Sequence, residues 1–392
     1  MGQSYELGSL QDEQDFQRLG DILCQSFRVL KSDWLDYSRI IGLENFRVLR
    51  GGQGVVGGLV VYPMGQWWGG ECLPLAGIAA VGIAPEYRGQ GAARCLMEQT
   101  LREVYEREFP LSALYAATQP LYRSVGYEQG GTRCYWQVPL EGWAGIQGCL
   151  PMVRLADEEI LGHCEGVYRQ FAARCSGYLE RHPALWQMIL HPQQGSAFAY
   201  GVGEVGALQG YIVFSQRSQT AERILDICDW AALTDEAQRT LWHFLSLHRS
   251  QLEYCRWYGS VIEPRLALLP EQSAQILSSE LWFLRIVNVP LALELRSYPS
   301  LMTTELHLAI EDPIIEENQG CFVLEVAGGK GRVKRGGRGS LRLKIGSLAP
   351  LYSGLYSAAQ LSQRGQLEGE EAEIAIASQV FGSSLPAMPD LF

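Results

Sequence analysis

The sequence predicts an α+β (mixed α/β) protein of three domains, with limits at 1–150, 151–290 and 291–392. Helical and strand patterns alternate in the first of these ranges, and a weaker version of the same series follows in the second. In the third, apolar residues alternate with other residues, as in half-buried strands. With 392 residues, and roughly 100–200 residues to a domain, the chain is long enough for several hydrophobic cores.

The first domain is expected to alternate between helices and strands. In order, we expect a helix at 13–30, strands at 46–50, 55–62 and 73–84, a helix at 91–107 and a strand at 113–117. Pro85 ends the third of these strands, and Pro120 suits the first turn of a short helix that carries Tyr122. This order of elements fits a layered domain.

The second domain repeats this order of elements. The expected elements are a helix at 157–174, strands at 197–202, 209–215 and 224–233, a helix at 235–249 and a strand at 256–262. We therefore expect two copies of one plan in tandem. The last helix of the second copy starts with Asp235 and Glu236. Two carboxylates there favour the helix dipole but repel a phosphate, so only the first copy is expected to bind an anion.

The third domain is expected to be a small sheet covered by helices at 348–361 and 371–380. Three alternating segments predict three half-buried strands of an antiparallel sheet: Leu306/Leu308/Ile310, Phe322/Leu324/Val326 and Leu341/Leu343/Ile345. Between Ala327 and Leu367 there is no acidic residue, while basic residues cluster at Lys330, Arg332, Lys334, Arg335, Arg338, Arg342 and Lys344. This cluster predicts a solvated hairpin, or a surface that pairs with an acidic neighbouring subunit.

The charge and the cysteines narrow the functional classes. The net charge of −11 makes a nucleic-acid partner unexpected and favours a cationic one. The ten cysteines include no Cys-x-x-Cys pair, which disfavours a zinc site, so we expect no metal and a reducing compartment. The N-terminus lacks a signal-peptide pattern, and the longest apolar stretch, 72–85, is shorter than the roughly 20 residues of a membrane span. A cytoplasmic protein without a membrane span is expected.

The segment from Val81 to Ala93 is the most informative one. It predicts a strand, a turn at Pro85, a loop with Gly89 and Gly91, and the start of a helix. The two glycines allow main-chain N–H groups to turn toward one point, and the N-terminus of the helix adds partial positive charge. A pyrophosphate fits such a loop, although a glycine pair can also serve only to cap a helix.

Two nucleotide-binding motifs do not fit this loop. A Walker A loop requires a lysine, and none is close to the loop. A dinucleotide fingerprint requires a small residue where Arg94 stands, and an acidic residue after the next strand, which ends in Leu114-Tyr115-Ala116-Ala117. The loop therefore predicts an anion site of another kind.

The pattern Arg88-x-x-Gly91-x-Ala93, after an apolar strand that ends in Pro85, resembles the acyl-coenzyme A signature of the GCN5-related N-acetyltransferases (GNAT). The resemblance implies acetyl-coenzyme A (acetyl-CoA) as the donor substrate. It also implies that Val81 and Ile83 lie along the thioester and the pantetheine chain. The pyrophosphate would be held by the loop and helix start, which comprise Arg88, Gly89, Gln90, Gly91, Ala92 and Ala93.

The whole chain resembles the enhanced intracellular survival (Eis-like) acetyltransferases. The resemblance rests on the tandem halves, on the segment 121–127 (LYRSVGY), on a C-terminal sheet domain like that of sterol carrier proteins, and on the final Phe. It implies two tandem GNAT-like domains followed by a sterol-carrier-protein-like α+β domain. It makes Tyr122 the general acid and the free carboxylate of Phe392 the base. It further implies an amine acceptor, such as an aminoglycoside, a polyamine or a lysine side chain, and a homo-oligomer, specifically a homohexamer.

General chemistry supports these roles in part. The first histidine is His163, so the first domain has no histidine base of its own. A tyrosine hydroxyl, with an ordinary pKa of about 10, can donate a proton to a departing thiolate. An α-carboxylate with a pKa of about 3.5 is a weak base toward an alkylammonium with a pKa of about 10.4. We therefore expect the Phe392 carboxylate to orient the amine and relay its proton, directly or through water. A Phe that only completes a core is the simpler alternative.

The acceptor pocket lacks a clear motif. Asp33, Trp34 and Asp36 are candidates for its wall, because acidic and aromatic side chains suit a cationic amine, and a solvated face is the alternative. Two other functions stay open: transfer of a longer acyl group, and a non-enzymatic lipid-carrying or regulatory module built on the third domain. An open apolar tunnel in that domain would favour lipid carriage, and a filled core would favour the enzyme.

Overall fold

The computed structural model of the protein describes residues 4–52, 54–141, 143, 145–156, 158–192, 196–217 and 223–392. These residues form two compact units. The first unit consists of the chain up to Gly131, of Leu281–Ser384 and of Phe392, and the second consists of Thr132–Glu280 and Leu385–Leu391. Each unit has its own sheet structure and core, and each is described by itself.

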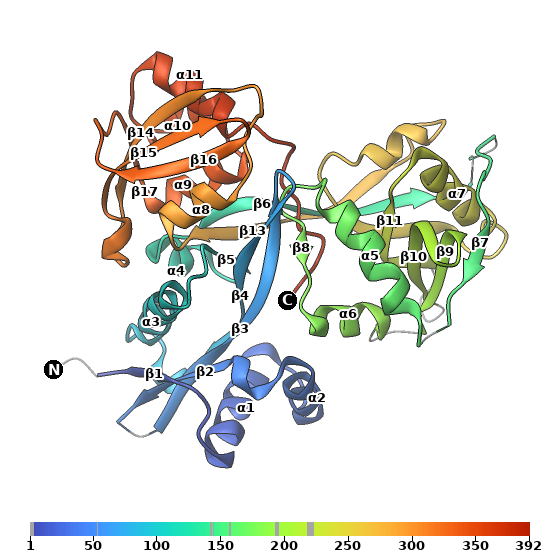
Figure 1. Ribbon diagram of the computed structural model, residues 1–392. Coiled ribbons are helices and arrows are strands. Elements are labelled where there is room, and N and C mark those ends of the chain that lie inside the picture. The colour runs from blue at the N-terminus through green and yellow to red at the C-terminus, as the bar shows by residue number, and fades with distance from the viewer. Residues whose placement is uncertain are drawn as a thin grey trace. The chain divides into compact units, whose positions relative to one another are not determined.

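The N-terminal part of the first unit is a sheet with helices on both faces (Figure 1). Its strands are, in spatial order, β1 (Glu6–Gly8), β2 (Phe46–Gly51), β3 (Gly54–Trp68), β4 (Glu71–Ile83), β5 (Leu111–Tyr115) and β13 (Gln275–Ile286). Neighbouring strands are antiparallel, except that β4 and β5 are parallel. The mixed α/β class is confirmed.

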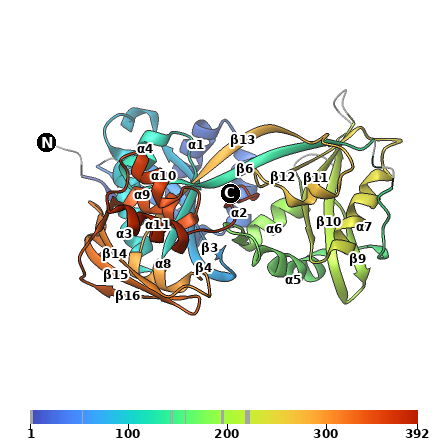
Figure 2. The ribbon, with the colours of Figure 1, turned by 90° about the horizontal axis from the view of Figure 1, so that it is seen from above.

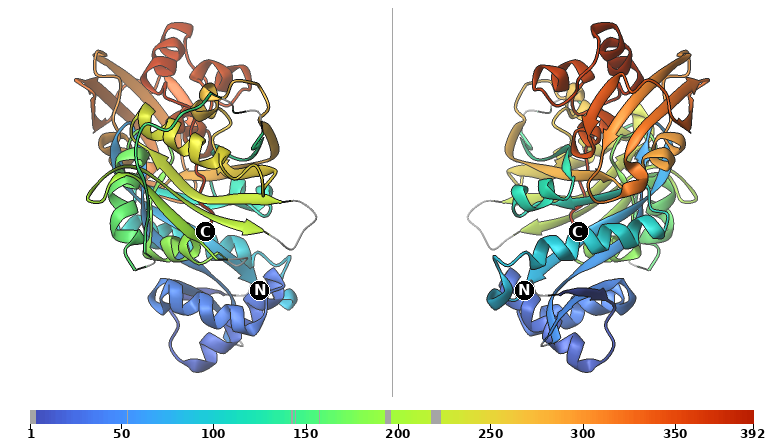
Figure 3. Two further views of the ribbon diagram at one scale, coloured as in Figure 1. Left: turned by 90° about the vertical axis from the view of Figure 1, so that its right-hand side faces the viewer. Right: turned by 90° about the vertical axis from the view of Figure 1, so that its left-hand side faces the viewer.

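Helices α1 (Glu13–Phe27) and α2 (Lys31–Ile41) lie side by side on one face of this sheet (Figure 3, blue). The helix predicted at 13–30 is therefore shorter, because Arg28 adopts a left-handed φ of 57° and ends it. Helix α3 (Ala92–Glu106) packs on the opposite face, where it shares a core with β3 and β4. The short helix α4 (Gln119–Ser124) follows β5.

The C-terminal part of the first unit is a second sheet with helices packed on one side of it (Figure 2). Its strands are, in spatial order, β16 (Lys330–Arg335), β15 (Gly320–Ala327), β14 (Thr304–Glu311) and β17 (Leu341–Lys344). The helices are α8 (Val289–Leu295), α9 (Ile345–Ser353), α10 (Ala358–Gln363) and α11 (Glu371–Val380). The alternating residues Leu308, Phe322 and Leu341 are fully buried, so the inner face of the sheet forms a filled core.

Two predictions about this part are wrong. The sheet has a further strand, β16, and β17 runs parallel to β14, so the sheet is not the antiparallel set of three strands that the alternation predicts. The helix predicted at 348–361 is two helices, because Gly354 takes a φ of 74° and ends α9. Apolar alternation identifies a strand only where one face is buried and the other is not, and β16 is mostly exposed.

Several residues of the basic cluster have acidic partners within the first unit. Lys330 pairs with Glu71 at 2.5 Å, and Lys334 pairs with Glu325 at 2.5 Å. Arg338 Nη2 lies 3.7 Å from a carboxylate oxygen of Glu373. These exposed pairs agree with the solvated hairpin.

The second unit contains a sheet of the same plan. Its strands are, in spatial order, β6 (Glu128–Pro139), β12 (Tyr254–Gly259), β11 (Ile224–Ala232), β10 (Ala207–Arg217), β9 (Phe198–Glu204) and β7 (Met152–Arg154). Again one pair, β11 and β12, is parallel and the other neighbours are antiparallel. Helices α5 (Ile160–Ala172) and α7 (Asp235–Ser246) pack against β10 and β11. The predicted tandem of two similar copies is confirmed.

Short elements complete the described chain. They are β8 (Leu179–Glu180), α6 (Pro183–Leu190) and the 3-10 turns η1 (Leu43–Asn45), η2 (Pro85–Tyr87), η3 (Pro264–Leu268) and η4 (Glu316–Asn318). Over the ranges that the structure describes, no helix has both the length and the apolar character needed to cross a membrane.

Candidate active site

In the first unit, strands β4 and β5 separate partway along their length. Their parallel pairing reaches only from Leu75 to Gly77 of β4, although β4 continues to Ile83. A β-bulge follows, because between Ala79 and Gly82 the strand β4 has one residue more than β3 opposite it. Ala80 in this bulge has a φ of 50°. The two strands therefore form a fork, and its β4 side beyond Gly77 is not paired with β5 in the described residues.

Strand β4 leads through η2 into an exposed loop and then into α3. Gly89 and Gly91 in this loop have φ values of 73° and 83°, a backbone region that favours glycine. A Cβ added at either position would meet nothing within 4 Å. The backbone conformation, rather than crowding, is therefore what requires the two glycines, and the loop is open on its outer side.

The start of α3 is rich in main-chain donors that the fold does not use. Gly91 is the N-cap residue of α3 and has no side chain that could accept a hydrogen bond from the first turn. That turn has no acidic residue either. Among the described residues, the N–H groups of Gly89, Gln90 and Gly91 donate no main-chain hydrogen bond. The first N–H groups of a helix also lack partners within it. This arrangement fits an anion such as a pyrophosphate, which would accept these hydrogen bonds.

Side chains hold the loop in this shape. Arg88 Nε donates to the carbonyl of Ile83 at 3.0 Å, and Gln90 Nε2 donates to the carbonyl of Glu86 at 2.8 Å. Arg18 pairs with the carboxylate of Glu86 at 2.6 Å. Backbone hydrogen bonding and then Arg18 lower the pKa of Glu86. These contacts fix the conformation of the loop and hold the cationic side chain of Arg88 beside it.

The equivalent helix start in the second unit is closed to an anion. Thr234 caps α7, since its hydroxyl accepts a hydrogen bond from Ala237 N at 3.2 Å. Asp235 and Glu236 lie in the first turn, and Asp235 pairs with Arg239 at 2.6 Å. One donor of the first turn is thus capped, and the two carboxylates beside the others disfavour an anion.

The second unit also has a fork, but ion pairs occupy its neighbourhood. The pairing of β11 with β12 ends at Asp226, and β11 has an extra residue at Cys228. Arg181 binds both carboxylate oxygens of Asp229, at 2.6 and 2.9 Å, and also binds Asp390 at 2.9 Å. These charges satisfy one another in a buried setting, so paired side chains lie beside this fork.

Phe392 lies against strands of the first unit. Its ring centroid is 5.8 Å from that of Tyr62 in β3 and 6.2 Å from that of Tyr115 in β5. A Cβ added at Gly77 would lie 2.8 Å from Cε2 of the Phe392 ring. The ring is therefore packed where β4 and β5 begin to separate, with Tyr62 in turn bonded to the hydroxyl of Tyr37 at 3.1 Å.

Tyr122 is placed by α4 beside the same strands. It is 5% exposed and belongs to the core that includes Ile78 of β4 and Leu114 of β5. Its ring meets the edge of the Tyr127 ring at 6.1 Å. Burial raises the pKa of Tyr122 to about 12, so its hydroxyl is protonated at neutral pH. In the described residues no hydrogen bond or ring contact joins Tyr122 and Phe392.

The three candidate acceptor residues do not form a common wall. Trp34 is 6% exposed and packs on Phe16 and Phe46 in the core. Asp33 accepts a hydrogen bond from the N–H of Leu30 at the start of its own helix, at 3.0 Å. Asp36 is exposed and pairs with Arg39 at 3.4 Å. The contacts of Trp34 and Asp33 are those of structural residues.

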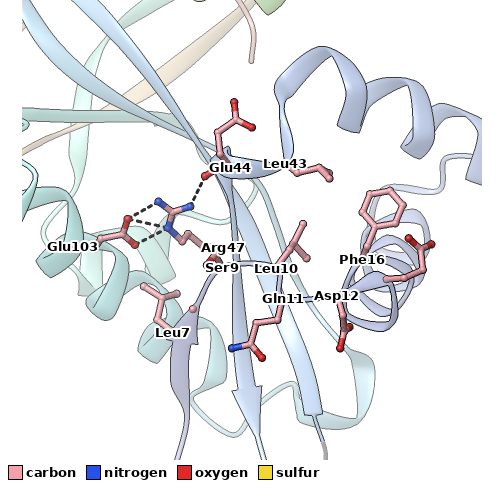
Figure 4. A pocket seen from close by; sticks show the side chains of 12 residues that line it. Leu7, Ser9, Leu10, Gln11, Asp12, Phe16, Leu43, Glu44, Arg47 and Glu103 are labelled. Atoms are coloured by element: carbon pink, nitrogen blue, oxygen red, sulfur yellow. Dashed lines mark hydrogen bonds and ion pairs between the residues drawn. The ribbon is translucent and has the colours of Figure 1, made fainter.

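A hollow of about 930 Å³ lies elsewhere on the first unit, between the N-terminal segment, α1 and η1 (Figure 4). Leu10 and Phe16 line it, and its one arginine, Arg47, is held by Glu103 at 2.6 Å and by the carbonyl of Glu44 at 2.8 Å. None of the sequence-predicted site residues lines this hollow. Its arginine is already paired with Glu103, so we assign the hollow no role.

A further hollow, of about 710 Å³, lies on the C-terminal sheet. Glu311, Arg342 and Lys344 are among the residues that line it. Such a charged lining does not suit an acyl chain. Among the described residues no group of three or more His, Cys, Asp or Glu side chains is arranged to hold a metal ion.

Sequence reasoning did not find the residues around Phe392. Tyr62, Tyr115 and Gly77 come from three different strands, and nothing in their local sequence separates them from the other tyrosines and glycines. Only the pairing of the strands brings them together. A sequence signal exists at the glycine loop, because there the required residues are consecutive.

Comparison with known proteins is consistent with this geometry. Acetyltransferase (GNAT) domain models match residues 9–130 and 177–286, and a sterol carrier protein domain model matches residues 289–389. The crystal structure of a GCN5-related N-acetyltransferase from Anabaena variabilis is similar with a TM-score of 0.96 and 44% identity, covering 99% of this chain and 100% of that one.

Curated relatives are more distant. The N-acetyltransferase Eis of Mycobacterium tuberculosis is 25% identical over 318 residues, which is 77% of this chain and 76% of that protein. An uncharacterized N-acetyltransferase of Streptomyces griseus is 27% identical over 355 residues, 83% of each chain. The chain therefore belongs to the GCN5-related N-acetyltransferases, as an Eis-like enzyme with two acetyltransferase domains and a C-terminal sterol carrier protein domain.

Proposed function

We propose that the protein transfers the acetyl group of acetyl-CoA to a primary amine of a cationic acceptor, such as an aminoglycoside, a polyamine or a lysine side chain. The observation that carries the proposal is the β4–β5 fork with the donor-rich loop at the end of β4. The fork leaves main-chain groups of β4 available to a thioester, and the loop suits its pyrophosphate. At the start of α7 in the tandem copy, Thr234 caps one donor and two carboxylates disfavour an anion, so we assign the reaction to the first unit alone.

The residues at the fork take distinct parts in donor binding. Val81 and Ile83 lie along the pantetheine and thioester, beside the bulge of β4. The pyrophosphate accepts hydrogen bonds from the loop and helix start, which comprise Arg88, Gly89, Gln90, Gly91, Ala92 and Ala93. Main-chain donors at a helix start are preorganised, so they bind an anion without the entropy loss of ordering long side chains.

The reaction is a direct attack of the amine on the thioester. The nitrogen forms a bond to the carbonyl carbon, and the C–S bond breaks with its electron pair going to sulfur. The nitrogen loses a proton and the sulfur gains one. Tyr122 supplies the proton to sulfur and is then reprotonated from solvent. Burial raises the pKa of Tyr122 to about 12, so the hydroxyl keeps its proton until negative charge develops on the sulfur.

The α-carboxylate that Phe392 carries as the last residue orients the amine and relays the proton that the nitrogen loses. Its packing between β3 and β5 supports a place at the fork. A net charge of −11 favours the approach of a cationic acceptor. The ten free thiols suit a cytoplasmic enzyme. The hexamer and the three-domain limits stay predictions, and the acceptor wall is left without assigned residues because Trp34 is buried and Asp33 binds the start of its own helix.

The first experiment tests the activity itself. The protein is incubated with acetyl-CoA, or with a longer acyl-CoA, and a panel of amines that includes an aminoglycoside, a polyamine and a lysine peptide. We expect thiol release that requires both donor and amine, and a mass increase of one or more acetyl groups on the amine. If no amine and no donor of the panel gives thiol release, the lipid-carrying module becomes the better account.

A variant of the loop tests the donor site. Gln90→Glu places a carboxylate where the pyrophosphate would bind, so we expect KM for acetyl-CoA to rise about tenfold while kcat changes by less than about twofold. Gln238→Glu makes the same change at the start of α7 and serves as the matched control, with KM unchanged. An unchanged KM in Gln90→Glu would remove the loop from the site.

A further inference from the structure

A buried ionic cluster of the first unit connects the C-terminal sheet with the turn after α4. Arg285, in β13, binds both carboxylate oxygens of Asp312, at 2.7 and 2.8 Å. The two side chains are 0% exposed. Asn318 donates to Asp312 at 2.9 Å and to the carbonyl of Val287 at 2.8 Å. Asp312 and Asn318 both follow β14 in the part of the chain that matches the sterol carrier protein domain.

The remaining donors of Arg285 reach the end of α4. Arg285 Nε donates to the carbonyl of Val125 at 3.1 Å, and Nη1 donates to the carbonyl of Ile286 at 2.7 Å. Gly126 has a φ of 85°, and a Cβ added there would lie 2.8 Å from Arg285 Nε. The turn and the guanidinium are therefore fitted to each other, and a side chain at this position would separate them.

This turn determines where Tyr122 points. The carbonyl of Tyr122 accepts hydrogen bonds from Val125 N and Tyr127 N, both at 3.1 Å. The helix α4 has only six residues, which is too short to hold its own orientation. Its position must come from tertiary contacts. Arg285 provides one of these contacts at the C-terminal end, three residues from Tyr122.

Stability alone does not account for this cluster. A buried ion pair costs desolvation, and apolar residues of similar volume are often as stable. What an apolar pair would not do is hold a particular carbonyl in a fixed direction, because only a donor with defined geometry does so. The planar guanidinium bridges Asp312 on one side and Val125 on the other, which an ammonium group does not match.

We propose that Arg285 is a positioning residue for Tyr122, and that Asp312 and Asn318 of the sterol carrier protein domain hold Arg285 in place. The inference rests on the proposed role of Tyr122 as the acid. It gives the C-terminal domain a part in acyl transfer that is separate from the terminal carboxylate. The domain fixes the helix that carries the acid, and it needs no lipid to do so.

The test uses Arg285→Lys in the full chain. Lysine keeps a positive charge beside Asp312 and loses the bond to the Val125 carbonyl. We expect kcat to fall about tenfold or more, with KM for acetyl-CoA within about twofold of wild type. Arg296→Lys is the matched control, because Arg296 is a buried arginine of the same unit that donates to the carbonyl of Tyr352 and does not contact α4. We expect it to keep its kcat.

Two further variants separate the possible outcomes. In a Tyr122→Phe background, Arg285→Lys should add little further loss, because both act through one hydroxyl. If the two substitutions lower kcat independently, so that their effects multiply, the inference is overturned. It is also overturned if Arg285→Lys keeps the wild-type kcat while Tyr122→Phe is impaired. Wild-type kcat in Tyr122→Phe alone would instead reject the proposed acid. If Arg285→Lys is unfolded by circular dichroism, the isosteric Asp312→Asn replaces it, with the same expected fall in kcat.

Discussion

The hydroxyl of Tyr122, the proposed general acid, is held in the protonated form that this role requires. It is buried on α4, and burial raises its pKa to about 12. Tyr122→Phe removes the hydroxyl and leaves the ring packed against Tyr127. We expect kcat to fall by about 10²- to 10⁴-fold, the usual scale for a general acid, with little change in the thermal midpoint. Steady-state kinetics and calorimetry on the same sample check both parts, and a wild-type kcat would contradict the assignment.

The same pKa fixes the alkaline limit of the reaction. A general acid works in its protonated form, so a pKa raised from 10 to about 12 keeps the acid competent to higher pH. We therefore expect that kcat does not fall near pH 10 through ionisation of Tyr122. A decline near pH 10 in wild type that is absent in Tyr122→Phe would show that Tyr122 ionises as an ordinary tyrosine.

The structural places of some residues could be predicted from the sequence, and those of others could not. The glycine loop was predictable because Gly89 and Gly91 are needed for their positive φ, and they stand next to a strand and a helix start. Trp34 was not, since an aromatic residue between two aspartates looks the same whether it lines a pocket or, as here, packs in a core. Arg285 gave no signal either, because its partners lie far away in the sequence.

Helices and strands with a clear local sequence pattern were predicted, and those set by tertiary contacts were not. The last helix was expected at 371–380 and α11 has those bounds. Strand β13 was not expected, since its first half, from Gln275, is exposed and has no alternation of apolar and polar residues, and only its second half pairs with β5. The fork could not be predicted from the sequence either. It depends on where the pairing of β4 with β5 stops, and tertiary contacts set that point.

The fork has little spare room at Gly77. A Cβ there would lie 2.4 Å from Met64 Cε and 2.8 Å from the Phe392 ring, and the rigid ring cannot yield as a methionine end can. We expect Gly77→Ala to displace Phe392, lower kcat and cost about 1–3 kcal/mol of stability, with acetyl-CoA affinity unchanged. Gly166→Ala, in α5 with nothing within 4 Å, is the matched control and should be slightly stabilising. Thermal unfolding, kcat and isothermal titration of acetyl-CoA measure these effects.

The two acetyltransferase domains and the C-terminal domain differ in the features that bear on function. The first acetyltransferase domain has the open loop, while the second has a capped helix start and buried ion pairs. The C-terminal sheet has a filled core, which favours the enzyme over lipid carriage. The two copies therefore share a fold and differ at the start of the equivalent helix, which suits an anion in the first copy and disfavours one in the second.

The last residue gives the sharpest test of this division. Phe392 clusters with the first unit, while Leu385–Leu391 belong to the second, where Arg181 binds Asp390. In the proposed mechanism the α-carboxylate of Phe392 acts at the fork, so a few residues added after Phe392 would remove it from there and leave the loop at Gly89 and Gly91 unchanged. We therefore expect turnover to be lost while the Kd for acetyl-CoA, measured by calorimetry, stays within about twofold of wild type. The same extension added at the N-terminus is the control for the effect of extra residues. Full turnover in the C-terminal extension would exclude the carboxylate from the mechanism, and a parallel loss of acetyl-CoA binding would mean that the tail supports the donor site instead.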